Sequence, residues 1–154
     1  MGKENHEIRT GDILVVDDDI GCLQMLSLFL ESEGFDVTAT SDGAKALKIL
    51  ENNKFKMIIS DFNMPAMNGV ELAIKVRERH SGTPVVLLTG SEISVVIEEA
   101  AGAGISEIFC KPVHLKRLIT AIRSSFYPCR NKTSDLYVRR MATRPPDPIV
   151  PNVG

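Results

Sequence analysis

Short apolar runs alternate along this chain with longer stretches in which apolar residues recur at helical spacing. The apolar runs predict strands at residues 13–16, 37–40, 57–60, 85–89 and 105–110. The stretches between them predict helices at residues 20–33, 43–53, 69–80 and 91–101. A last helix is predicted where apolar side chains share one helical face, at Leu115, Leu118, Ile119, Ile122 and Phe126. The chain therefore repeats a strand–helix unit.

The predicted strands are apolar along their length rather than at alternate residues. Runs such as ILVV at residues 13–16 and VVLL at 85–88 would be buried on both faces, as parallel strands under crossover helices are. The predicted fold class is thus α/β, with an open, doubly wound parallel sheet. Ligands of such sheets bind beyond the carboxyl ends of the strands, so candidate chemistry is expected where each strand ends.

Length and composition favour one domain with one core, because the chain has 154 residues and 44% of them are hydrophobic. A net charge of −2 lacks the basic excess with which proteins bind nucleic-acid phosphates. No apolar run approaches the roughly 20 residues of a membrane span, and the polar start MGKENHEIRTGD lacks the apolar core of a signal peptide. We expect a cytoplasmic protein that does not enter a membrane, with Cys22, Cys110 and Cys129 as reduced thiols.

A change of composition near residue 127 suggests where the folded part ends. We expect an N-terminal extension at residues 1–10, the domain at 11–127 and a C-terminal tail at 128–154. The tail holds five Arg or Lys against two Asp and ends in a Pro-rich stretch, which predicts a largely disordered segment. No DNA-binding domain would fit after residue 127, so we expect the domain to stand alone.

Polar and charged residues close four of the predicted strands, in the order Asp17, Asp18 and Asp19, then Asp61, Thr89 and Lys111. Crowded carboxylates raise one another's pKa values unless a cation neutralises them. An all-oxygen site is the kind that Mg²⁺ prefers. These residues therefore predict a magnesium site, with Mn²⁺ as the alternative metal, although Asp19 would serve equally well as a helix N-cap.

The same residues fit phosphoryl transfer. A carboxylate beside a metal can attack phosphorus while the metal and a cationic side chain offset the charge of the transferred group. Asp61 fits the nucleophile, Lys111 the cation, and Thr89 a hydroxyl donor to a phosphoryl oxygen. Because a phosphoryl group adds up to about −2 charge, recruitment of Thr89 could shift nearby loops. Such chemistry describes a switch rather than a turnover enzyme.

Over residues 11–127 the sequence resembles the receiver domains of two-component response regulators. The resemblance rests on four stretches, ILVVDDD at residues 13–19, DFNMPAMNG at 61–69, LLTG at 87–90 and CKP at 110–112. It implies a flavodoxin-like sheet of five strands in the order 2-1-3-4-5. It also implies phosphoryl donation by a sensor histidine kinase or a His-containing phosphotransfer protein, followed by slow self-catalysed loss of the phosphoryl group.

The resemblance assigns roles to individual residues. Asp61 would be the phosphoacceptor, with Lys111, Thr89 and Asp17 completing the catalytic set. Asp18, Asp61 and the backbone carbonyl of Asn63 would bind Mg²⁺, and Asp17 would bind it through water.

Further positions take secondary roles by the same resemblance. The side chains of Asn63 and Ser91 would tune the rate of dephosphorylation, and Gly90 would leave room for the phosphoryl group. We assign Pro65, Met67 and Gly69 to loop geometry and packing rather than to the site.

One position departs from the family pattern. Three residues before the lysine the family usually carries Tyr or Phe, and this sequence has Ile108. The neighbouring Phe109 should not replace the missing ring, because successive strand residues point to opposite faces. The usual coupling of threonine movement to an aromatic rotamer is therefore not expected here, whereas phosphoryl transfer is.

The output would be contact with an unknown downstream protein or passage of the phosphoryl group along a relay. By resemblance, the contact surface would comprise the strand 85–89, the helix 91–101 and the strand 105–110. The same surface could also join two copies in a homodimer.

Two other classes share part of the pattern. Asp17-x-Asp19 after a strand, with Thr89 and Lys111 later, resembles haloacid-dehalogenase phosphatases, in which Asp17 would be the nucleophile; against this class, Gly21 stands where Thr or Val is usual, and DFNMPAMNG is unexplained. A flavodoxin-like redox module would cradle a flavin phosphate in backbone N–H groups, whereas here the first strand runs into three aspartates that would repel it.

Overall fold

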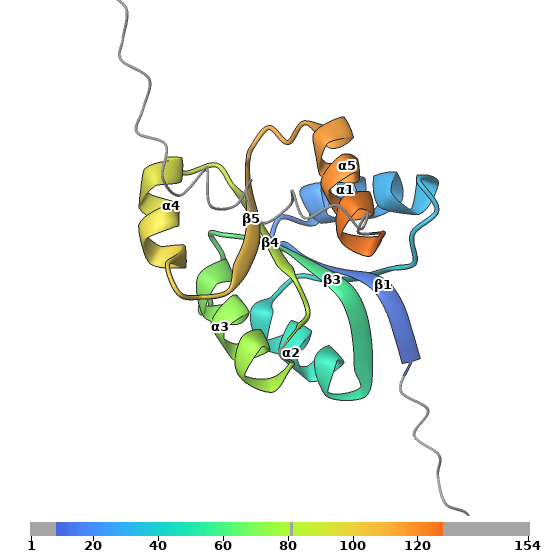
Figure 1. The fold of residues 1–154 in the computed structure, drawn as a ribbon, viewed down its shortest axis with the longest axis horizontal. Helices are drawn as coiled ribbons and strands as arrows, with labels where there is room; N and C mark the ends of the chain where they lie inside the picture. Colours follow the sequence, from blue (N-terminus) through green and yellow to red (C-terminus); the bar gives the residue numbers. More distant parts are fainter. Residues whose placement is uncertain (1–8, 81, 128–154) are drawn as a thin grey trace, which may run out of the picture.

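In the computed structural model, which describes residues 9–80 and 82–127, strands and helices alternate along the chain (Figure 1). The strands are β1 (Arg9–Val16), β2 (Val37–Thr40), β3 (Asn53–Asp61), β4 (Val85–Thr89) and β5 (Ile105–Cys110). The helices are α1 (Ile20–Ser32), α2 (Gly43–Asn52), α3 (Gly69–Arg79), α4 (Ile93–Ala100) and α5 (Leu115–Phe126). Every strand and helix that the sequence predicts is confirmed.

The strands form one parallel sheet in the order β2-β1-β3-β4-β5. Helices α1 and α5 cover one face of the sheet, and α2, α3 and α4 cover the other (Figure 1). The predicted flavodoxin-like order and the doubly wound architecture are therefore confirmed.

Two apolar clusters, one on each face of the sheet, form the core. Along β1, Ile13 and Val15 belong to the cluster under α1 and α5, while Leu14 and Val16 belong to the cluster under α2 to α4. All four are at most 1% exposed, and burial of such a side chain contributes about 1.5–3 kcal/mol. The unbroken apolar runs reflect this burial on both faces.

Two strands are longer than their apolar runs. β1 begins at Arg9 rather than residue 13, inside the range expected as an extension, and β3 begins at Asn53 rather than residue 57. Arg9 pairs with Asn53 and Thr10 with Lys54. The sequence pattern missed this pairing because it is made by the main chain, which requires no apolar side chains.

The helices differ less from the sequence prediction. The largest change is at α4, which starts at Ile93 rather than residue 91, after an N-cap residue, Glu92, whose side chain makes no capping hydrogen bond. None of the helices within residues 9–80 and 82–127 combines the length and apolar character that crossing a membrane would require. The predicted tail at 128–154 lies outside the described residues.

The register of the sheet sets which residues meet at its carboxyl end. Val16 pairs with Ser60, Asp61 with Leu88, and Thr89 with Cys110. The residues that follow these pairs therefore come together at one end of four adjacent strands.

Candidate functional site

Three carboxylates meet where β1 and β3 end. Asp17, Asp18 and Asp61 each offer an oxygen, and these oxygens lie within 4.8 Å of one another. In an octahedral magnesium site with ligands at about 2.1 Å, opposite ligand atoms are roughly 4 Å apart. The spacing and the all-oxygen chemistry therefore fit Mg²⁺, and no other group of three potential ligands occurs in the described part of the chain.

The turn after β1 fixes the first of these carboxylates. The backbone N–H of Asp17 donates to the carbonyl of Thr40 at 3.2 Å, and Asp17 Oδ1 accepts from the N–H of Asp19 at 2.9 Å. Asp19 in turn is the N-cap of α1, because its Oδ1 accepts from the N–H of Cys22 at 2.9 Å. Of the two roles left open for Asp19, the structure shows the cap.

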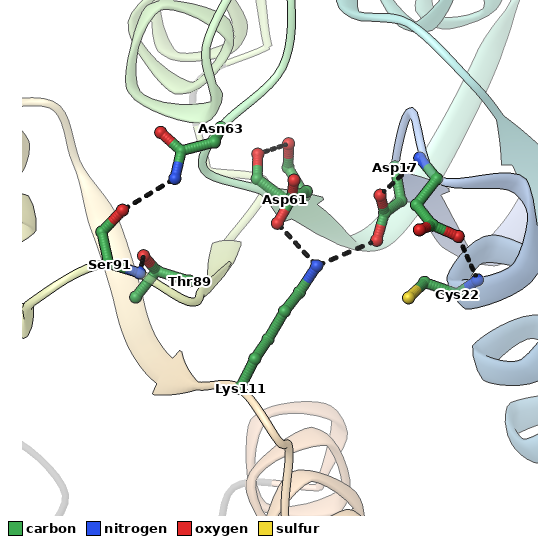
Figure 2. Close-up of polar contacts among 9 residues, drawn as sticks. Asp17, Cys22, Asp61, Asn63, Thr89, Ser91 and Lys111 are labelled. Carbon is green, nitrogen blue, oxygen red and sulfur yellow. Dashed lines mark hydrogen bonds and ion pairs between the residues drawn. The ribbon is translucent and has the colours of Figure 1, made fainter.

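Lys111 brings the end of β5 into the same cluster. Its Nζ lies 2.8 Å from Asp61 Oδ1 and 3.3 Å from Asp17 Oδ2, and Figure 2 shows it reaching between the two carboxylates. Its backbone N–H donates to the carbonyl of Thr89 at 2.7 Å, which fixes the root of the side chain. One ammonium group is thus shared by two aspartates.

This sharing leaves the site short of positive charge. Burial raises the pKa of Asp61, the hydrogen bond and charge of Lys111 oppose that rise, and the carboxylates of Asp17 and Asp18 add to it, so the pKa is raised overall. Burial lowers the pKa of Lys111, but Asp61 and Asp17 outweigh burial and raise it. Lys111 therefore stays positively charged, but its charge does not fully neutralise the carboxylates around Asp61. A divalent metal ion would supply the missing positive charge.

Three polar side chains lie near Asp61: Asn63 in the loop after β3, and Thr89 and Ser91 at and after the end of β4. Thr89 is fully buried, and its Oγ1 accepts from the N–H of Ser91 at 2.9 Å. The hydroxyl of Ser91 accepts from the amide of Asn63 at 2.7 Å, so the loops after β3 and β4 are joined across the site (Figure 2). The sequence singled out both residues but did not predict that they would bond to each other.

Gly90 and Ile108 differ in their surroundings. A Cβ added at Gly90 would meet no atom within 4 Å, so the space beside it is open. Ile108 packs with the cluster under α2 to α4, whereas Phe109 belongs to the cluster under α1 and α5. Phe109 therefore does not occupy the position of the missing ring.

A serine hydroxyl and two thiols lie next to residues of the site. Ser60 is fully buried, and its hydroxyl donates to the carbonyl of Asp61 at 2.9 Å. Sequence patterns did not indicate this contact, because Ser60 looks like an ordinary strand residue. Cys22 and Cys110 are free thiols, and burial raises the pKa of Cys22. Cys129 lies outside the described residues.

Comparisons with known proteins agree with this geometry. A family model described as "Response regulator receiver domain" matches residues 13–123. The transcriptional regulatory protein GlrR of Escherichia coli (strain K12) is 32% identical over 134 residues, which are 87% of this chain and 30% of GlrR. The DNA-binding response regulator MtrA of Mycobacterium tuberculosis (strain H37Rv) is 33% identical over 112 residues, 73% of this chain and 49% of MtrA. The chain therefore spans half or less of the length of these two relatives.

Solved receiver structures have the same fold. The chemotaxis response regulator CheY4 of Vibrio cholerae superposes with a TM-score of 0.68 at 31% identity, covering 77% of this chain and 98% of CheY4. The Francisella response regulator 1452 receiver domain superposes with a TM-score of 0.70 at 28% identity, covering 75% and 96%. Sequence and structure thus point to the same family.

Proposed function

Because the chain belongs to the response-regulator receiver family, whose domains are signalling modules rather than turnover enzymes, we propose that it accepts a phosphoryl group on Asp61 from a phosphohistidine donor. The observation that carries this proposal is the position of Lys111 Nζ, 2.8 Å from Asp61 Oδ1 at the centre of the acidic cluster. The donor would be a sensor histidine kinase or a His-containing phosphotransfer protein. We propose that the transfer takes place in the cytoplasm.

In the proposed reaction, a carboxylate oxygen of Asp61 attacks phosphorus. A P–O bond to Asp61 forms and the P–N bond of the phosphohistidine breaks, leaving its electron pair on the imidazole nitrogen, which takes a proton from water. The ammonium of Lys111 offsets negative charge on the phosphoryl oxygens, and Asp17 orients that ammonium through the 3.3 Å contact.

Asp18, Asp61 and the backbone carbonyl of Asn63 would hold Mg²⁺, with Asp17 holding it through water, and Mn²⁺ could take its place. When bound, the metal would supply positive charge to the carboxylates and to the transferred group. Asp17 is the least exposed of the three acidic side chains and is already anchored by Asp19. This pre-organisation supports a role in orientation rather than direct attack.

Switching would begin at Thr89. Its Oγ1 accepts a hydrogen bond from Ser91, which leaves the hydroxyl hydrogen free for donation to a phosphoryl oxygen, and Gly90 offers open space beside it. Ile108 carries no ring that could change rotamer with this movement. We therefore propose a switch in the backbone around β4 that works without an aromatic side chain.

Loss of the phosphoryl group would depend on Asn63 and Ser91. Their side chains are joined by a 2.7 Å hydrogen bond between the loops after β3 and β4, and we propose that this bond limits the approach of an attacking water. Removal of either side chain should change the dephosphorylation rate.

The output surface would lie over β4, α4 and β5. Helix α4 buries one side chain, Val96, and leaves Ile93, Val95 and Ile97 between 40% and 48% exposed. This apolar exposure supports contact with a downstream protein or with a second copy of the chain.

The test is phosphorylation by acetyl phosphate, followed as one added phosphoryl group by intact mass. We expect labelling of the wild type that requires Mg²⁺, no labelling of Asp61→Asn, and normal labelling of Asp12→Asn, which changes a carboxylate at the opposite end of the sheet. Labelling that persists in Asp61→Asn and disappears in Asp17→Asn would support the phosphatase class instead. An unlabelled wild type would contradict the proposal.

A further inference from the structure

Gly69, the first residue of α3, lies against the backbone of the proposed nucleophile. A Cβ added there would be 2.5 Å from the carbonyl oxygen of Asp61, 2.8 Å from a methyl carbon of Leu87 and 3.2 Å from the Cα of Phe62. Two of these three neighbours, the Asp61 carbonyl at the end of β3 and the Phe62 Cα just after it, are backbone atoms, which cannot move aside as the end of a flexible side chain could. A side chain at Gly69 therefore requires this backbone to shift.

The start of a helix does not itself require glycine, because α1, α4 and α5 begin at Ile20, Ile93 and Leu115. Gly43 is the first residue of α2, and the nearest atom to its added Cβ is Met67 Sδ at 2.9 Å, in a flexible side chain. The two glycines thus share a helix position but differ in what they contact. Only Gly69 touches Asp61.

Hydrogen bonds prevent α3 and the Asp61 backbone from separating. The N–H of Gly69 donates to the carbonyl of Phe62 at 2.9 Å, and the N–H of Phe62 donates to Leu88 at 2.8 Å. Asn68 and Glu71 form a capping box, with both hydrogen bonds at 2.9 Å, that fixes where α3 begins. Substitution at Gly69 would therefore displace the peptide of Asp61 rather than the helix alone.

Ser60 holds the same carbonyl oxygen from within the strand. Its hydroxyl donates to Asp61 at 2.9 Å and is fully buried. The carbonyl of Asp61 thus has a hydrogen-bond donor and a close backbone neighbour, while the carboxylate of Asp61 points to Lys111.

We propose that Gly69 and Ser60 are positioning residues for phosphoryl transfer, which hold the Asp61 backbone so that its carboxylate faces Lys111 and the metal-binding carboxylates. This inference rests on the proposed function. Because a misplacement of 1 Å can cost about 100-fold in rate, Gly69→Ala should slow labelling by roughly 10- to 100-fold. Ser60→Ala, which removes one hydrogen bond, should slow it about 5-fold.

The experiment compares the wild type, Gly69→Ala, Ser60→Ala and the matched control Gly43→Ala. Three quantities are measured for each: the labelling rate with acetyl phosphate, the Mg²⁺ dissociation constant by calorimetry, and the free energy of unfolding in urea. Amide chemical shifts of Asp61 and Phe62 report the backbone position directly. We expect Gly69→Ala and Ser60→Ala to slow labelling, weaken Mg²⁺ binding and shift these two amides, while Gly43→Ala behaves as wild type.

A purely structural role would lower the unfolding free energy of Gly69→Ala but leave the folded molecules with the labelling rate and Mg²⁺ affinity of the wild type, and that result overturns the inference. If Gly69→Ala does not fold, the test rests on Ser60→Ala. A wild-type labelling rate and Mg²⁺ affinity in that variant also overturn the inference. If the wild type itself is not labelled, the proposed function fails, while Mg²⁺ affinity and the two amides still test the positioning role.

Discussion

The two ends of the sheet treat charge in opposite ways. At the carboxyl end, Asp17, Asp18 and Asp61 lie together, and within residues 9–80 and 82–127 one cation, Lys111, forms ion pairs with this cluster, at Asp17 and Asp61. At the amino end, two acids each have a cation of their own: Lys56 Nζ lies 2.6 Å from Asp12 Oδ1, and an Arg123 nitrogen lies 2.9 Å from a Glu33 oxygen. The carboxylates at the carboxyl end are only partly neutralised, whereas these two pairs at the amino end are balanced one to one.

The pKa values follow this difference. A hydrogen bond from the backbone of Asp36 and a bond from Lys56 lower the pKa of Asp12, whereas burial and crowding raise that of Asp61. Lys56 also lies 5.4 Å from the ring centre of Phe126, which packs edge-on against Phe35 at 5.6 Å. A carboxylate with a cation of its own, such as Asp12, stabilises the fold. A buried carboxylate whose charge is only partly neutralised, such as Asp61, indicates a site of chemistry.

The largest effect is expected when the shared cation is removed. In metal-free buffer Lys111→Met should lower the free energy of unfolding by about 2 kcal/mol, less than the roughly 3–5 kcal/mol of a fully buried pair because Lys111 is partly exposed. Urea denaturation measures it. Mg²⁺ should restore much of this loss by supplying the missing positive charge.

Lys56→Met is the matched control at the amino end. Its loss should be smaller and should not respond to Mg²⁺. The proposed difference between the two ends of the sheet would be wrong if both variants lost the same free energy of unfolding. It would also be wrong if Mg²⁺ did not stabilise Lys111→Met.

A second prediction concerns the sign of the pH dependence. The folded pKa of Asp61 lies above its unfolded value, so Asp61 destabilises the fold at neutral pH and does so less as the pH falls through the raised pKa. The folded pKa of Asp12 lies below its ordinary value of 3.8, so its contribution is present above that value and is lost as the pH falls through the lowered pKa.

In EDTA at pH 7 we therefore expect Asp61→Asn to be more stable than wild type by about 1 kcal/mol, and Asp12→Asn less stable by about 1 kcal/mol. Both differences should shrink in acid, where the carboxyl groups are protonated. Thermal unfolding between pH 7 and pH 3 measures them. Differences of the same sign would contradict the comparison.

The smallest effect is expected at the exposed pair Glu33–Arg123. A double-mutant cycle with Glu33→Gln and Arg123→Gln should give a coupling of about 0.3 kcal/mol, falling further in high salt, because exposed ion pairs are screened. A coupling as large as that between Lys111 and Asp61 would mean that pairing at the amino end contributes more than its exposure allows.

The sequence predicted the layers of the fold and the principal site residues for one physical reason. Strands buried on both faces are apolar without interruption, so their limits are visible, and the polar residue that ends each strand stands out, as Asp61 and Lys111 do. Hydrogen bonds between the main chains of two strands need no apolar side chains, so the sequence pattern does not reveal them. The start of β1 at Arg9 was therefore missed.

Other features depend on distances that a sequence does not contain. Gly69 was assigned to loop geometry, because nothing in DFNMPAMNG reveals that a Cβ at this position would lie 2.5 Å from the carbonyl oxygen of Asp61. The bond between Asn63 and Ser91 joins loops 28 residues apart and requires the register of β3 against β4. Asp19 fitted two roles until the turn geometry showed the cap.

The contact between Asp17 and Lys111 joins residues 94 positions apart, and the site draws on the ends of four different strands. A fragment that lacks any of these four strand ends does not contain the whole site. Under the proposed function, a molecule truncated before Lys111 would therefore not be phosphorylated, so the phosphorylated fraction in a cell would count only molecules in which all four strand ends are present.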